Sequence, residues 1–167
     1  MGNLMLTTRD EILERLAALG IEHRTHLHPP VFTVEEAQLH TRHLSGGHCK
    51  NLFLKDKKGG LWLVTCRDEL KVDLNWLSRR LGAPRFSFGR PELLAEVLGV
   101  TPGSVTPLAV VNDTAGSVKV VLDQGLLAHE WVNCHPLQND ATTTLRAADL
   151  VRYMVETGHA PMLVEFD

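Results

Sequence analysis

Apolar residues recur every three to four positions in several segments of this chain, which is the spacing of an amphipathic helix. The clearest segment carries Ile12 and Leu16 and begins at a Thr-x-x-Glu capping pattern that starts at Thr8. It ends at Gly20, a residue type that commonly follows the last turn of a helix. Start signals, with a following glycine in the last two cases, predict further helices over residues 33–40, 73–81 and 91–98. A last helix is predicted over residues 147–156.

Shorter apolar runs between these helices predict β-strands. Residues 49–54 and 61–66 flank a charged turn that contains two glycines, so they predict a β-hairpin. Residues 142–145 fit either a short strand or the approach to the last helix. Further strands are predicted at 22–27, 85–88, 108–111, 118–122, 131–134 and 162–166. Because the elements lack a regular β-α-β rhythm and no linker divides the chain, we expect one α+β domain over residues 1–167.

Composition narrows the class of protein. Apolar residues make up 44% and charged residues 22% of the chain, which is typical of a folded globular protein and not of a disordered one. No apolar run approaches the roughly 18 residues that a membrane span needs. The first residues lack a basic segment and a long apolar stretch, so we expect no signal peptide. The cysteines are odd in number and form no Cys-x-x-Cys pair, which favours the reducing cytoplasm: Cys49, Cys66 and Cys134.

The net charge of −3 conceals an uneven distribution. Residues 42–90 hold eleven basic and four acidic side chains, whereas the segments on either side are acidic. A basic segment of this kind can bind phosphate groups even in an acidic protein. Charges that interleave on a solvated surface would give the same composition, so charge alone leaves both interpretations open.

Several kinds of catalytic site are excluded or disfavoured. The sequence has no phosphate-binding P-loop, no Gly-x-Gly-x-x-Gly motif and no Gly-x-Ser-x-Gly nucleophile elbow. The pair His40 and His43 provides too few ligands for zinc, so we expect neither a metal nor a cofactor. Cys134 and His135 are adjacent in a predicted strand and should point to opposite faces, Cys134 into the core and His135 towards a cleft.

Three features remain, and together they resemble one family. They are Lys50-Asn51 at the head of an apolar strand, the loop 103–107 of sequence Gly-Ser-Val-Thr-Pro, and His135-Pro136-Leu137. With the segment 28–37, they resemble the YbaK/ProRS-INS-type aminoacyl-tRNA deacylases, which are freestanding relatives of the editing insertion of prolyl-tRNA synthetase. The resemblance extends over residues 9–166 and is closest to the subgroup called ProXp-ala or ProX.

This resemblance implies a mixed, mostly antiparallel or barrel-like sheet surrounded by helices, and hydrolysis of mischarged alanyl-tRNA(Pro). It implies that the Lys50 ammonium contacts the phosphate of the 3′-terminal adenosine or the polarised ester. It places Gly103 in a loop whose backbone amides hold the aminoacyl carbonyl. It places His135 in the amino-acid pocket and leaves open whether His135 also acts as a general base. Substrate binding is expected from Asn51, Ser104, Val105, Thr106 and Pro107. Contacts to the acceptor stem of tRNA(Pro) are expected from Lys55, Lys57, Lys58, Lys71, Arg79 and Arg80.

The expected partners are the acceptor stem and 3′ end of tRNA(Pro), and either prolyl-tRNA synthetase or another translation component, with no role for DNA or a membrane. Three alternatives stay open at this point. The chain could hydrolyse cysteinyl-tRNA(Pro), the activity of a sister branch of the same superfamily. It could be a noncatalytic module that binds tRNA or the synthetase, or it could be a metal or thiol enzyme.

Overall fold

The computed structural model describes residues 5–166. Its α-helices are α1 (Arg9–Ala18), α2 (Val34–Thr41), α3 (Leu74–Leu81), α4 (Pro91–Leu98) and α5 (Ala147–Glu156). Its strands are β1 (His23–Leu27), β2 (Gly47–Asp56), β3 (Leu61–Arg67), β4 (Phe86–Phe88), β5 (Val118–Asp123), β6 (Trp131–Cys134), β7 (Ala141–Arg146) and β8 (Met162–Val164). These elements confirm the predicted α+β class. The expectation of one domain over residues 1–167, and that of no signal peptide, involve residues 1–4 or 167, which lie outside the described part.

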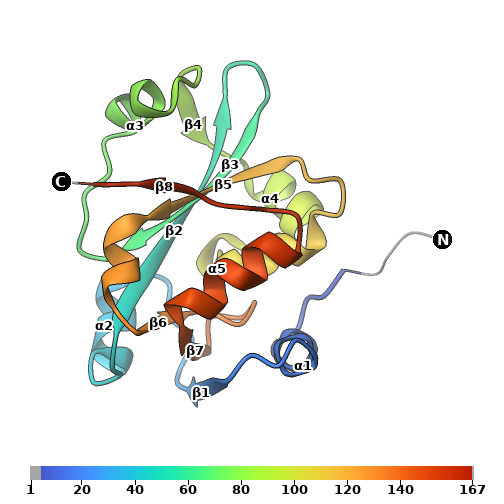
Figure 1. Cartoon of the computed structure of the whole chain (residues 1–167), viewed down its shortest axis with the longest axis vertical. Coiled ribbons are helices and arrows are strands. Elements are labelled where there is room, and N and C mark those ends of the chain that lie inside the picture. Colours follow the sequence, from blue (N-terminus) through green and yellow to red (C-terminus); the bar gives the residue numbers. More distant parts are fainter. Residues whose placement is uncertain (1–4, 167) are drawn as a thin grey trace.

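The eight strands form one mixed sheet in the order β1-β7-β6-β2-β3-β5-β8, with β4 paired to β2. Four of the seven pairings are antiparallel, and the parallel ones join β2 to β6, β3 to β5 and β5 to β8. The long hairpin β2–β3 runs through the middle of the molecule, and α3 and β4 lie near its tip (Figure 1). β2 pairs with β6 at its beginning and with β4 at its end, so it links the two halves of the sheet.

Side-chain caps begin α1, α2 and α3 where the sequence predicts these helices. Thr8 and Glu11 form the complete capping box of α1, and Thr33 caps α2 by accepting a hydrogen bond from the Glu36 backbone N–H at 3.1 Å. Asp73 caps α3, and Gly82 ends that helix with a left-handed backbone at φ +65°. Residues 142–145 belong to the strand β7 and not to the approach to α5.

One predicted strand is wrong. Residues 108–111 lie in the 3-10 helix η2 (Pro107–Asn112), which the Thr106 side chain caps by accepting a hydrogen bond from the Leu108 N–H at 3.3 Å. Leu108, Ala109 and Val110 are all fully buried. An apolar run that is buried on every side has no periodicity, so it cannot distinguish a strand from a helical turn.

Two apolar clusters lie on opposite faces of the hairpin. Phe53 and Leu63 belong to the larger cluster, which includes residues of α1, α4 and α5. Leu54 and Trp62 belong to the smaller one, which α3 covers. Both faces of β2 and β3 are therefore buried, which explains why these strands read as continuous apolar runs.

All three cysteines are free thiols. No helix within residues 5–166 is long and apolar enough to cross a membrane.

Candidate functional site

The three sequence features that the resemblance singled out line one cavity of about 200 Å³. β2 provides Lys50 and Asn51, the segment after α4 provides Gly103 and Val105, and His135 follows the end of β6. Three further predicted residues, Ser104, Thr106 and Pro107, are buried and do not line the cavity. The fold thus brings Lys50, Gly103 and His135 together from distant parts of the chain.

Asn51 fixes the loop that follows α4. Its side-chain N–H donates to the Val105 carbonyl at 3.1 Å, and its side-chain oxygen accepts from the Thr65 hydroxyl at 2.7 Å. Thr65 is the residue opposite Asn51 in the β2–β3 ladder. Because both ends of the Asn51 amide are engaged, the loop is held against a rigid hairpin.

The Lys50 ammonium lies at the edge of the cavity and is held by one backbone group. Its Nζ donates a hydrogen bond to the Leu70 carbonyl. Within the described part of the chain it forms no ion pair. An ammonium has three N–H donors, so two of them stay available to a ligand.

His135 presents an unprotonated ring nitrogen. Its Nδ1 lies 3.0 Å from the Ala141 carbonyl, which can only accept, so Nδ1 carries the proton. Burial lowers the pKa of His135 below its usual value of 6.5, so the ring is neutral at pH 7 and Nε2 is an acceptor. Cys134 points the other way into the larger core cluster, as the strand alternation predicts.

The lowered pKa of His135 predicts a pH dependence of stability. In the unfolded chain this ring takes up a proton near pH 6.5, whereas the folded protein resists protonation until the pH is lower. Its contribution to the free energy of unfolding is therefore complete above pH 6.5 and is lost as the pH falls through the folded pKa.

We expect the wild-type protein to lose more stability than His135→Gln between about pH 7 and about pH 5, measured by urea unfolding. Other titrating groups are common to both proteins and cancel in the difference. Parallel pH profiles for the two proteins would contradict this assignment.

The thiols are poorly suited to nucleophilic attack. Cys49 lines the cavity, but burial, together with the neighbouring Cys134 and Cys66, raises its pKa well above the usual value. Burial also raises the pKa of Cys66 and of Cys134 to about 12. Since the thiolate is the nucleophile, the structure gives no support to a thiol enzyme. No cluster of three or more metal-ligating side chains occurs between residues 5 and 166.

The cavity also contains residues that the sequence analysis did not select. Phe32 is 73% exposed, and its ring lies close to Gly103. A Cβ atom added to Gly103 would be 3.4 Å from the Phe32 ring and 3.2 Å from the amide nitrogen of Asn139. Asp68 follows β3 and brings a carboxylate that forms no ion pair among the described residues. Phe32 lies within the segment 28–37 that carried part of the resemblance, whereas no sequence signal identified Asp68.

The six basic residues predicted to bind tRNA are all exposed. Three lie around the tip of the β2–β3 hairpin and two lie on α3, and the hairpin tip and α3 share one end of the molecule in Figure 1. Lys71 lies in the segment that joins β3 to α3. In the part of the chain that the structure describes, none of the six forms an ion pair, unlike Arg9, Arg67 and Arg146. They are Lys55, Lys57, Lys58, Lys71, Arg79 and Arg80.

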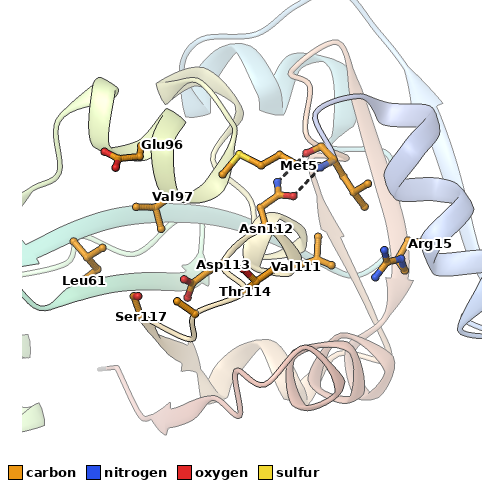
Figure 2. A pocket seen from close by; sticks show the side chains of 12 residues that line it. Met5, Arg15, Leu61, Glu96, Val97, Val111, Asn112, Asp113, Thr114 and Ser117 are labelled. Atoms are coloured by element: carbon orange, nitrogen blue, oxygen red, sulfur yellow. Dashed lines mark hydrogen bonds between the residues drawn. The ribbon is translucent and has the colours of Figure 1, made fainter. Parts of the chain in front are cut away.

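Two larger hollows, of about 640 and 710 Å³, contain none of the three residues predicted as catalytic. Figure 2 shows the former, in which the Asn112 side chain makes two 2.8 Å hydrogen bonds to the backbone of Leu6. These bonds attach the N-terminal segment to η2. Since neither large hollow contains Lys50, Gly103 or His135, the smaller cavity is the better candidate site.

Comparisons with known proteins indicate the family to which this chain is similar. The family model for the aminoacyl-tRNA editing domain matches residues 28–153. Prolyl-tRNA synthetase associated domain-containing protein 1 of Danio rerio is 48% identical, over 95% of this chain and 88% of that protein. The prolyl-tRNA editing protein ProX of Acetoanaerobium sticklandii is 32% identical, over 96% and 98%. A solved structure titled as a candidate trans-editing enzyme for prolyl-tRNA synthetase shares the fold, with a TM-score of 0.74, 21% identity and coverage of 97% and 99%.

Proposed function

We propose, since the chain belongs to the aminoacyl-tRNA editing domain family, that it hydrolyses alanyl-tRNA(Pro) and releases alanine and free tRNA(Pro). The observation that carries this proposal is the meeting of Lys50, Gly103 and His135 in one small cavity. A relative named as a prolyl-tRNA editing protein supports the choice of tRNA(Pro).

The size and lining of the cavity support a small amino acid. Val31, Val34, Ala37 and Val105 give it an apolar side that suits a methyl group, within a volume of about 200 Å³. A synthetase pocket that accepts proline cannot strongly reject alanine, because missing methylenes provide only about 1–3 kcal/mol of discrimination. A second and smaller pocket can select alanine and exclude the proline ring by steric overlap.

The polar side of the cavity suits an aminoacyl ester. In the proposed reaction, water adds to the ester carbonyl carbon, the bond to the ribose oxygen breaks, and that oxygen takes up a proton. The free N–H donors of Lys50 stabilise the charge that develops on the carbonyl oxygen. The Asp68 carboxylate pairs with the α-ammonium group of the substrate. His135 Nε2 accepts a hydrogen bond from that ammonium or from the attacking water.

The exposed basic residues around the hairpin tip and α3 suit an RNA acceptor stem. Contacts of unpaired lysine and arginine side chains with phosphates release counterions, so the affinity for tRNA should fall as salt rises. This arrangement lets one protein hold the stem on its basic surface while the ester reaches the cavity.

The proposal predicts selective deacylation. Purified protein is incubated with tRNA(Pro) charged separately with alanine, cysteine or proline, and the loss of each ester is followed against the rate without protein. We expect rapid loss of alanine and retention of proline. Selective loss of cysteine would instead place the chain with the cysteinyl-tRNA(Pro) deacylases. Retention of all three esters, with tRNA still bound, would overturn the proposal in favour of a noncatalytic binding module.

A further inference from the structure

A second hollow, of about 270 Å³, lies beside the candidate site and has aromatic walls. Trp76 of α3 and Phe166 lie with their ring centroids 5.7 Å apart and their planes tilted by 50°. Both side chains pack against the smaller core cluster and stay partly exposed. The segment after β8 approaches α3 here, on the left of Figure 1. The remaining lining residues are Leu70, Lys71, Val72 and Asp73.

One hydrogen bond connects this hollow to the candidate site. Leu70 lines the hollow, and its carbonyl accepts the bond from the Lys50 ammonium that borders the catalytic cavity. The two spaces therefore adjoin across the Lys50–Leu70 contact. A ligand whose reacting group lies against Lys50 can place a neighbouring group against Trp76.

The charges around the hollow suit a polyanion. Arg79 and Arg80 follow Trp76 by three and four residues in α3, so all three lie on one side of the helix. With Lys71 on the wall, these cations form no ion pair within residues 5–166. The one carboxylate on the wall, Asp73, accepts hydrogen bonds from two α3 backbone N–H groups at 3.0 and 3.1 Å.

We infer that this hollow binds an unpaired nucleobase from the 3′ end of the tRNA, stacked on Trp76, while the aminoacyl ester occupies the adjoining cavity. This inference rests on the proposed function. Single-stranded RNA is typically held by aromatic side chains that stack on bases, beside cations that contact the phosphates. An aromatic wall, free cations and direct connection to the ester site occur together in this hollow.

Another tryptophan provides a matched control. Trp131 lines a hollow of about 330 Å³ and has the Arg24 and Arg146 guanidinium groups 5.9 and 4.5 Å from its ring centroid. Arg146 is already paired with Glu22 at 2.9 Å and lies 3.8 Å from Glu130. These carboxylates repel phosphates, so removal of the Trp131 indole should leave RNA binding unchanged.

The test is equilibrium binding of an uncharged stem-loop RNA that reproduces the tRNA(Pro) acceptor stem, followed by the fluorescence anisotropy of a label on the RNA. One RNA keeps its unpaired 3′ nucleotides and a second RNA lacks them. The proteins are wild type, Trp76→Leu and Trp131→Leu, and thermal unfolding establishes that each is folded. A stacked base predicts that Trp76→Leu weakens binding of the complete RNA about tenfold. It predicts equal binding of the shortened RNA by all three proteins.

The outcomes separate this inference from the proposed function. If wild type binds and deacylates its substrate while Trp76→Leu binds the complete RNA as tightly as wild type, the base pocket is wrong and the proposed function stands. An equal loss of binding for both RNAs would also overturn the pocket, since Trp76 would then act away from the unpaired end. If the predicted difference appears without deacylation of any ester, the pocket stands and the proposed activity fails.

Discussion

Replacing Lys50 by alanine is expected to lower kcat/KM for deacylation of alanyl-tRNA(Pro) by about 10²–10³-fold, the usual effect of removing one donor to a developing oxyanion. The Lys50 ammonium is anchored to the Leu70 carbonyl and keeps two free N–H groups at the cavity. No other lysine or arginine lines this cavity within the described chain. We expect the loss mainly in kcat, because the interaction strengthens as charge develops on the ester oxygen.

A matched lysine separates this effect from a general loss of charge. Lys119 is an exposed lysine on β5 whose ammonium lies 4.9 Å from the centroid of the Trp62 ring. Lys119→Ala should deacylate at the wild-type rate in the same single-turnover assay. Thermal unfolding of Lys50→Ala close to that of wild type would exclude misfolding as the cause. Wild-type kcat/KM in a folded Lys50→Ala protein would contradict the proposed role.

Most of the helices were predictable because their ends carry local signals. A capping threonine or aspartate and a following glycine act over a few residues, so α1 and α3 could be located without knowledge of the fold. The hairpin β2–β3 was equally predictable from its turn, where Asp56 accepts hydrogen bonds from the Lys58 and Gly60 N–H groups at 2.8 and 2.9 Å.

The error at residues 108–111 arose because tertiary packing, and not local sequence, decides that segment. The Tyr153 hydroxyl of α5 donates to the Leu108 carbonyl, and Asn112 bonds to the Leu98 carbonyl at 2.8 Å. Tyr153 lies 45 residues from Leu108 in sequence, and Leu98 lies 14 residues from Asn112. The sequence pattern of residues 108–111 alone cannot reveal contacts with residues so distant in the chain.

The candidate site was predictable only in part, for a related reason. Lys50, Gly103 and His135 were found because a family resemblance links them across 85 positions of the chain. Asp68 enters the cavity because β3 ends beside the start of β2, where its backbone N–H donates to the His48 carbonyl at 2.9 Å. That position depends on strand register, which a single sequence does not reveal. The same dependence hides the pairing of Trp76 with Phe166.

Removing the Asp113 carboxylate is expected to lower the free energy of unfolding by about 3–5 kcal/mol. Asp113 and His159 are buried, with the carboxylate Oδ2 2.9 Å from His159 Nε2 and 2.8 Å from the Val118 backbone nitrogen. Asp113→Ala leaves the His159 Nε2–H and the Val118 backbone N–H buried without an acceptor, and this loss lowers the free energy of unfolding. Asp113 also follows the last residue of η2, so this pair ties η2 to the segment after α5.

Asp140 provides the matched control, because it also pairs with a cation but at the surface. Its carboxylate lies 3.0 Å from the Arg9 guanidinium, and the two side chains are 41% and 28% exposed. Asp140→Ala should cost less than about 1 kcal/mol. Urea unfolding followed by tryptophan fluorescence measures both variants against wild type. If the Asp113 and Asp140 variants unfold at the same urea concentration, the buried pair is not what holds η2. Since η2 begins at Pro107, the last residue of the loop that carries Gly103, the buried pair stabilises the helix that directly follows this loop.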